Sequence, residues 1–211
     1  MANRIQVKAR YAKPIIKDYE INNGKSTYRL INGMTSPMTQ DKLAEFYETA
    51  KQKGNPLPMS APQLFSVIED AANSGNKDLI NFIREGLQKY PNTLSKVFYN
   101  PRGQNDETIH LCNTSDAYAI IGNIVGKDGF IKDIDNKNAL KYLIGTKDIQ
   151  KINRTSNKIN AKPTFIWRAN SKPNEQLEEI VRVYAFSDRF LLLAGGDFFG
   201  VYPSFLVEQV K

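Results

Sequence analysis

The spacing of apolar residues changes along the chain and predicts where strands give way to helices. Near the amino terminus, apolar and polar residues alternate over residues 4–11 and on both sides of Asn23-Gly24. A period of two is typical of half-buried strands. Asn-Gly favours a two-residue type I′ turn, because both central residues take positive φ. The pattern therefore predicts a strand at 4–11 and a β-hairpin over residues 18–31.

Helical spacing of three or four residues follows in three consecutive segments. Thr39 is the expected N-cap of the first helix and Gly54 its stop. Ser60 and Gln63 have the spacing of a capping box for the second helix. A third helix is expected over residues 77–90. The NPLPM segment between the first two helices predicts a loop, because it contains two prolines.

Strand patterns return after Pro91. The expected elements are hairpins at 94–113 and 178–195, single strands at 117–125 and 162–170, short helices at 136–145 and 146–158, and a final helical turn or strand at 203–210. Hairpins at both ends of the chain, with a three-helix segment inserted between them, predict an α+β fold rather than alternating α/β. We expect one α+β unit over residues 1–211, with a helical subdomain at 37–91 as the alternative division.

Composition restricts the class of protein. Hydrophobic residues make up 41% of the chain and charged residues 24%, which is typical of a soluble globular protein. No run of about 18 apolar residues predicts a membrane span. The single cysteine, Cys112, excludes an internal disulfide and favours a cytoplasmic location. Asp128, Asp133 and Asp135 are clustered but lack the ligand spacing of a calcium loop, so neither a metal nor another cofactor is expected.

The net charge of +7 is unevenly distributed. It is +5 over residues 1–36 and +8 over residues 137–172, whereas the other segments are neutral or acidic. Charge asymmetry of this kind indicates an acidic partner, although it says nothing about the fold.

The segment TKDIQKINRTSNK, residues 146–158, contains four of the nine cations of this positive block. At 100° per residue, Lys147, Lys151, Arg154 and Lys158 occupy a stripe about 60° wide on a helix. Isoleucines occupy the opposite side and predict a buried face. Lys137 and Lys141 add cations on the preceding short helix, and Asp148 is the only acid in residues 137–172. Stacked like charges cost a few tenths of a kcal/mol per pair, so a constraint such as ligand binding would explain them.

Three interpretations of this basic surface remain open. It is a solvated surface without a ligand, a site for the phosphates of DNA or RNA, or a site for an anionic membrane or an acidic protein. We favour non-catalytic nucleic-acid binding, largely insensitive to sequence, because nothing resembles a base-reading helix. Arg4, Lys8 and Arg10 alternate with apolar residues on the first expected strand and would extend the same surface.

An enzyme of unrecognised type is the first alternative. His110 and Cys112 lie two residues apart on an expected strand, where their side chains point in parallel and form a poor nucleophile–base pair. We interpret Cys112 as a core residue. A polar site would need His110 to gather with Asp116 and Arg102 in one pocket.

An interaction or structural protein is the second alternative, and its sign would be a large exposed apolar patch. The aromatic carboxyl-terminal segment is the place to look for it. We interpret Phe198, Phe199, Tyr202 and Phe205 as the edge of the core, folded around a glycine turn. Oligomeric state is not specified by any of these patterns.

Overall fold

The computed structural model describes residues 19–22, 27–102, 106–110, 117–120, 137–162, 164–168, 173–196 and 199–210. The expected strand at 4–11, with Arg4, Lys8 and Arg10, lies outside these residues, as do Cys112 and Asp116.

Helices and antiparallel strand pairs are segregated along the described chain, which confirms the predicted α+β class. The described helices are α1 (Gln40–Lys53), α2 (Ala61–Ser74), α3 (Lys77–Leu87), α4 (Lys137–Ile144) and α5 (Ile149–Asn160). The described strands are β1 (Tyr19–Asn22), β2 (Thr27–Met34), β3 (Leu57–Pro58), β4 (Asn92–Tyr99), β5 (Asp106–His110), β6 (Ala117–Ile120), β7 (Thr164–Arg168), β8 (Leu177–Ala185), β9 (Phe190–Gly196) and β10 (Phe205–Val210).

The first sheet joins the two ends of the chain in the order β1-β2-β10-β3. β1 and β2 form the predicted hairpin, but Asn22 pairs with Thr27, whereas a two-residue turn at Asn23-Gly24 would pair Asn22 with Lys25. The expected tight turn is therefore wrong. A shift of two residues nevertheless keeps each side chain on its expected face, because the side-chain period of a strand is two. β10 lies antiparallel to β2, so the last segment of the chain is a strand.

β3 occupies the segment expected to be a loop. Leu57 and Pro58 pair with Val207 and Leu206 of β10 at the edge of the first sheet. Proline lacks an N–H and is tolerated at a sheet edge, so two prolines in the sequence did not prevent this short pairing.

The second sheet has the order β6-β5-β4-β8-β9-β7. Both of its predicted hairpins are confirmed, β4–β5 and β8–β9. The β8–β9 turn has Ser187 and Asp188 at its tip, and the Phe186 N–H donates to the Arg189 carbonyl at 2.7 Å. β7 runs parallel to β9 and is the only parallel partner among the described strands.

Local signals in the sequence account for the ends of the first two helices. The Ser60 side chain accepts from the Gln63 N–H, and the Gln63 side chain accepts from the Ser60 N–H, which completes the predicted capping box of α2. Thr39 is the N-cap residue of α1 but its side chain forms no capping bond. Gly54 and Gly75 end α1 and α2 in the left-handed conformation that glycine favours.

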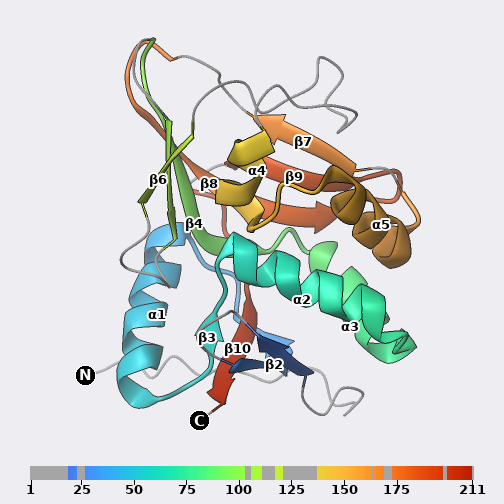
Figure 1. The fold of residues 1–211 in the computed structure, drawn as a ribbon. Coiled ribbons are helices and arrows are strands. Elements are labelled where there is room, and N and C mark those ends of the chain that lie inside the picture. The colour runs from blue at the N-terminus through green and yellow to red at the C-terminus, as the bar shows by residue number, and fades with distance from the viewer. Residues whose placement is uncertain are drawn as a thin grey trace.

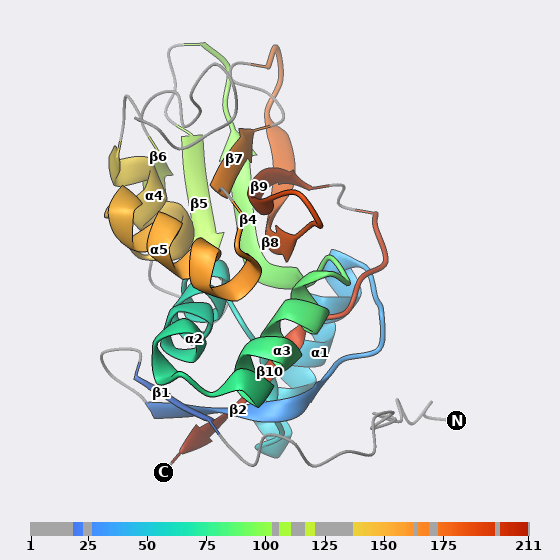
Figure 2. The same cartoon turned by 90° about the vertical axis from the view of Figure 1, so that its right-hand side faces the viewer.

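The helices α2 and α3 lie between the two sheets (Figures 1 and 2). One hydrophobic cluster contains residues from α2, α3, α4, α5 and from the strands of both sheets. Gly86 of α3 is essential to this packing, because a Cβ there would overlap the Phe205 ring of β10. The core therefore connects α2 and α3 to β10, the last strand of the chain. It also buries apolar side chains of α4 and α5.

Candidate nucleic-acid interface

The predicted basic helix is α5, and its ends are fixed by side chains. Asp148 is its N-cap and accepts from the Lys151 N–H at 2.9 Å. At the other end, Ala161 takes a left-handed conformation, and the Arg84 Nε of α3 donates to the Ile159 carbonyl at 2.7 Å. The helix therefore continues past Arg154 to Asn160, although its Asn, Ser and Thr residues favour loops.

The buried face of α5 is formed by Ile152, Thr155, Ser156 and Ile159. The two isoleucines join the main hydrophobic cluster, and this burial holds the helix against the protein. The opposite face is exposed, and its chemistry is uniform. Each exposed residue of α5 is a cation or an amide, namely Gln150, Asn153, Arg154, Asn157 and Lys158.

The four cations that were predicted to form one stripe do not all lie on α5. Lys147 precedes the N-cap, so it lies outside the helix and the angle assigned to it does not apply. It is exposed, as are Lys141 on α4 and Lys162 just after α5. Lys137 is the first residue of α4. None of Lys141, Lys147 and Arg154 forms a hydrogen bond or ion pair with the described residues through its side chain.

Two cations of the stripe contact α2 instead. The Lys151 Nζ lies 2.8 Å from a Glu69 carboxylate oxygen, and the Lys158 Nζ donates to the Asn73 Oδ1 at 2.8 Å. Part of the stripe therefore holds two helices side by side. No local pattern in the sequence predicts this contact, because Glu69 and Lys151 belong to different helices.

Asp70 shares the α2 surface with Glu69 and is half-buried. Burial and the neighbouring Glu69 charge raise the pKa of the Asp70 carboxyl above its ordinary value, although the Lys151 charge opposes this rise. The Asp70 carboxyl therefore releases its proton less readily than an exposed aspartate does.

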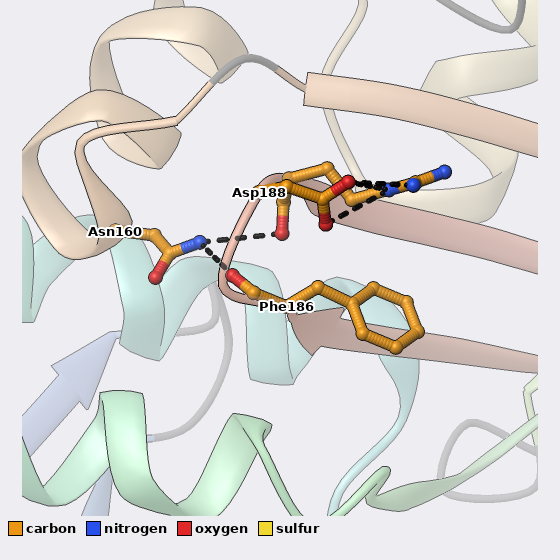
Figure 3. Close-up of polar contacts among 4 residues, drawn as sticks. Asn160, Phe186 and Asp188 are labelled. Carbon is orange, nitrogen blue, oxygen red and sulfur yellow. Dashed lines mark hydrogen bonds and ion pairs between the residues drawn. The ribbon is translucent and has the colours of Figure 1, made fainter.

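The carboxyl-terminal end of α5 is bound to the β8–β9 turn (Figure 3). The Asn160 Nδ2 donates to the Phe186 carbonyl at 2.8 Å and to the Arg189 carbonyl at 3.2 Å. At the tip of the turn, Arg189 forms an ion pair with Asp188 at 2.6 Å. The hydrogen bond from Arg189 lowers the pKa of the Asp188 carboxyl most, and the Lys162 charge lowers it further. Lys162 and Arg189 therefore belong to the same surface as α5.

Next to this turn lies a cluster of four aromatic rings. The Tyr90 ring centroid is 5.1 Å from that of Tyr184, 5.5 Å from that of Phe186 and 6.1 Å from that of Tyr202. The Arg182 guanidinium stacks on Tyr202 at 4.3 Å. Burial raises the pKa of Tyr184 to about 12, so its phenol stays neutral under ordinary conditions.

The aromatic carboxyl-terminal segment is divided between core and surface. Phe205 is buried and Tyr202 is half-buried, whereas the side chain of Phe199 is 82% exposed. The interpretation of Phe199 as a core residue is therefore wrong, since the chain turns outward before β10. Phe198 lies outside the described residues.

His110 is positioned by a partner that the sequence analysis did not identify. The Ser95 hydroxyl of β4 lies 2.6 Å from the His110 Nδ1, and the His110 Nε2 lies 2.8 Å from the Tyr142 carbonyl of α4. A carbonyl can only accept, so Nε2 carries the proton and Nδ1 accepts from Ser95. The Ala61 N–H at the start of α2 donates to the Ser95 oxygen at 2.8 Å.

This arrangement resembles the nucleophile–base–orienter geometry of hydrolases, but it is closed to solvent. Ser95 is 0% exposed and His110 is 3% exposed. Arg102 is on the surface beyond the end of β4. The hydrogen bonds instead join β4, β5, α2 and α4, which is a structural role.

Comparisons of the chain with protein-family models, with curated proteins and with solved structures give no match. The functional inference for this protein therefore depends on its own geometry.

Two kinds of site are absent from the part of the chain that the structure describes. No group of three or more His, Cys, Asp or Glu side chains there could hold a metal ion. The predicted cluster of Asp128, Asp133 and Asp135 lies outside that part. No helix among the same residues has the length and hydrophobicity needed to cross a bilayer.

Proposed function

We propose that this protein binds nucleic acid through its phosphate backbone, using α5 and the cations on either side of it. The observation that carries this proposal is the composition of the exposed face of α5, which consists only of Lys, Arg, Asn and Gln. These are side chains that donate hydrogen bonds to phosphate oxygens in protein–DNA complexes. A face without a ligand would normally include acids that relieve the repulsion between cations.

Neighbouring residues strengthen the positive charge. Residues 137–162 contain seven Lys or Arg and one acid, Asp148. The acids of α2 offset part of this charge, since Glu69 pairs with Lys151. Lys141, Lys147, Arg154 and Lys162 remain exposed and form no ion pair with the described residues. Four such contacts are enough to give binding that depends steeply on salt.

Fluorescence anisotropy of labelled random-sequence DNA, single-stranded and duplex, tests the proposal. The titrations would run from about 50 to 200 mM salt, where phosphate-driven binding weakens steeply. The variant is Lys147→Ala/Arg154→Ala, because both side chains are exposed and neither forms a hydrogen bond or ion pair with α2. Removing two phosphate contacts should reduce the log–log salt slope by about 1.4 on single strands and about 1.8 on duplex.

Lys42→Ala/Lys53→Ala is the matched control. It removes the same charge from exposed positions of α1, a helix at a different part of the fold (Figure 1). The control should keep the salt slope of the unmodified protein. Absence of binding at the lowest salt, or an equal loss in both variants, would refute a localised phosphate site.

A further inference from the structure

The large hydrophobic side chains that are exposed in the described chain gather at one place. They are Tyr90 at 39%, Phe199 at 82% and Val201 at 57% exposure. Gly200, which separates Phe199 from Val201, lies against the Tyr202 ring, and the Tyr202 ring lies 6.1 Å from the Tyr90 ring. Segments more than a hundred residues apart in the sequence therefore build a single apolar surface, which we call the aromatic surface (Tyr90, Phe186, Phe199, Val201 and Tyr202).

Tyr90, an exposed ring of this surface, packs against less exposed rings. Tyr90 rests edge-on against the buried Tyr184 and against Phe186, and these two rings contact each other at 5.4 Å. Its backbone takes φ of 57°, an uncommon conformation for a tyrosine. The surrounding packing therefore holds a large apolar ring in a strained position where water reaches it. Strain of this kind often accompanies a binding role.

Two arginines lie beside the rings, of which Arg189 is half-buried and Arg182 is buried. The Arg189 guanidinium lies 5.8 Å from the Phe186 ring centroid, and the Arg182 guanidinium stacks on Tyr202. The Phe186 carbonyl faces Asn160 of α5 while its ring points away from that helix (Figure 3). The β8–β9 turn therefore connects the aromatic surface directly to the cationic surface of α5.

This combination favours one class of ligand. Proteins that bind single-stranded nucleic acid combine cations that follow the phosphates with aromatic rings on which unpaired bases stack. The neighbouring arginines disfavour a cationic ligand such as methyl-lysine. The rings pack against one another and leave no cage of the kind that such ligands need.

We propose that Tyr90 and Phe199 are stacking positions for unpaired bases of a single strand whose phosphates bind to α5. This inference rests on the proposed function and adds to it a preference for single strands. Paired bases inside a duplex cannot reach such rings, so duplex DNA would use the cations alone.

Two oligomers of equal charge separate the inference from the proposed function. One is an oligothymidylate of about 12 nucleotides, within the range bound by known single-strand folds. The other is an abasic phosphodiester oligomer of the same length. Stacking should make the oligothymidylate bind roughly 5- to 150-fold more tightly per stacked base. Equal binding of the two would refute stacking but leave phosphate binding intact, and no binding of either would refute both.

The variant Tyr90→Leu/Phe199→Leu keeps an apolar side chain at both positions but removes the flat rings. It should lose the preference for the oligothymidylate while keeping the salt slope, which depends on α5. A preference that persists in this variant would refute the assignment of the rings, and a hydrophobic protein partner would then be the better explanation of the patch. Phe199→Leu alone tests the same point if the change at Tyr90 impairs folding, because Phe199 is largely exposed.

Discussion

Replacing Ser95 with alanine should destabilise the protein far more than the loss of one oxygen atom suggests. The Ser95 hydroxyl accepts from the Ala61 N–H at 2.8 Å and donates to the His110 Nδ1 at 2.6 Å. Ser95→Ala takes a partner from two buried groups at once. Each buried group that loses its partner costs about 1–3 kcal/mol, so we expect a loss of roughly 2–6 kcal/mol. That is a large part of a typical stability of about 5–15 kcal/mol.

Urea unfolding followed by circular dichroism measures this loss. With an m-value near the upper end of about 1–3 kcal/mol/M, which suits a chain of this length, the midpoint should fall by roughly 0.7–2 M. Ser66→Ala is the matched control, because Ser66 is half-buried on α2 and forms no side-chain hydrogen bond with the described residues. Its effect should stay within about 0.5 kcal/mol. A midpoint for Ser95→Ala that matches the control would show that the hydrogen-bond chain does not stabilise the fold.

Two further predictions concern α2 and α3. Gly86→Ala should destabilise the protein by about 1–3 kcal/mol in the same unfolding assay, because its Cβ would overlap the Phe205 ring, although alanine is the better helix former. Gly33→Ala is the control and should be nearly neutral, because a Cβ at Gly33 meets nothing within 4 Å. Equal effects of the two substitutions would refute the packing argument. The raised pKa of Asp70 means that its proton is bound more tightly in the folded state, so stability falls as the pH rises from the unfolded value of 3.8 through the folded value. Asp70→Asn should therefore stabilise the protein at pH 7, where the half-buried carboxylate is charged, and should have no such effect near pH 3, where the carboxyl is protonated in both states. A destabilised variant at pH 7 would contradict the shift.

The helices were predictable because their signals are local. Ser60, Gln63 and Gly75 specify the start and end of α2 within its own segment, and the structure uses all three. The α+β class followed from the order of periodic segments alone. The pairing of β10 with β2 did not, because no residue near Phe205 indicates which distant strand it joins. Strand partners are chosen by the shape of the whole core, which single-sequence periodicity does not contain.

The candidate surfaces also depend on contacts between elements, which local sequence patterns do not predict. The charge of α5 was visible in the sequence, but the contacts of Lys151 and Lys158 with α2 depend on how two helices pack. The partner of His110 lies fifteen residues away on the neighbouring strand, not two residues away on its own. Tyr90 gave no sequence signal, because its role depends on rings from β8 and from the loop before β10. Contacts between elements decide each of these cases.

The contacts with α2 also change which residues should be tested. Lys151 and Lys158 have an explanation in the fold, since they bind α2 at Glu69 and Asn73. Removing the whole stripe would loosen α5, and a loss of binding would then have two causes. Lys147 and Arg154 have no such explanation among the described residues, and neither does the absence of acids from the exposed face of α5. The proposed phosphate ligand would account for both facts. The double variant at Lys147 and Arg154 is therefore the sharper test, because it changes the charge that packing leaves unexplained.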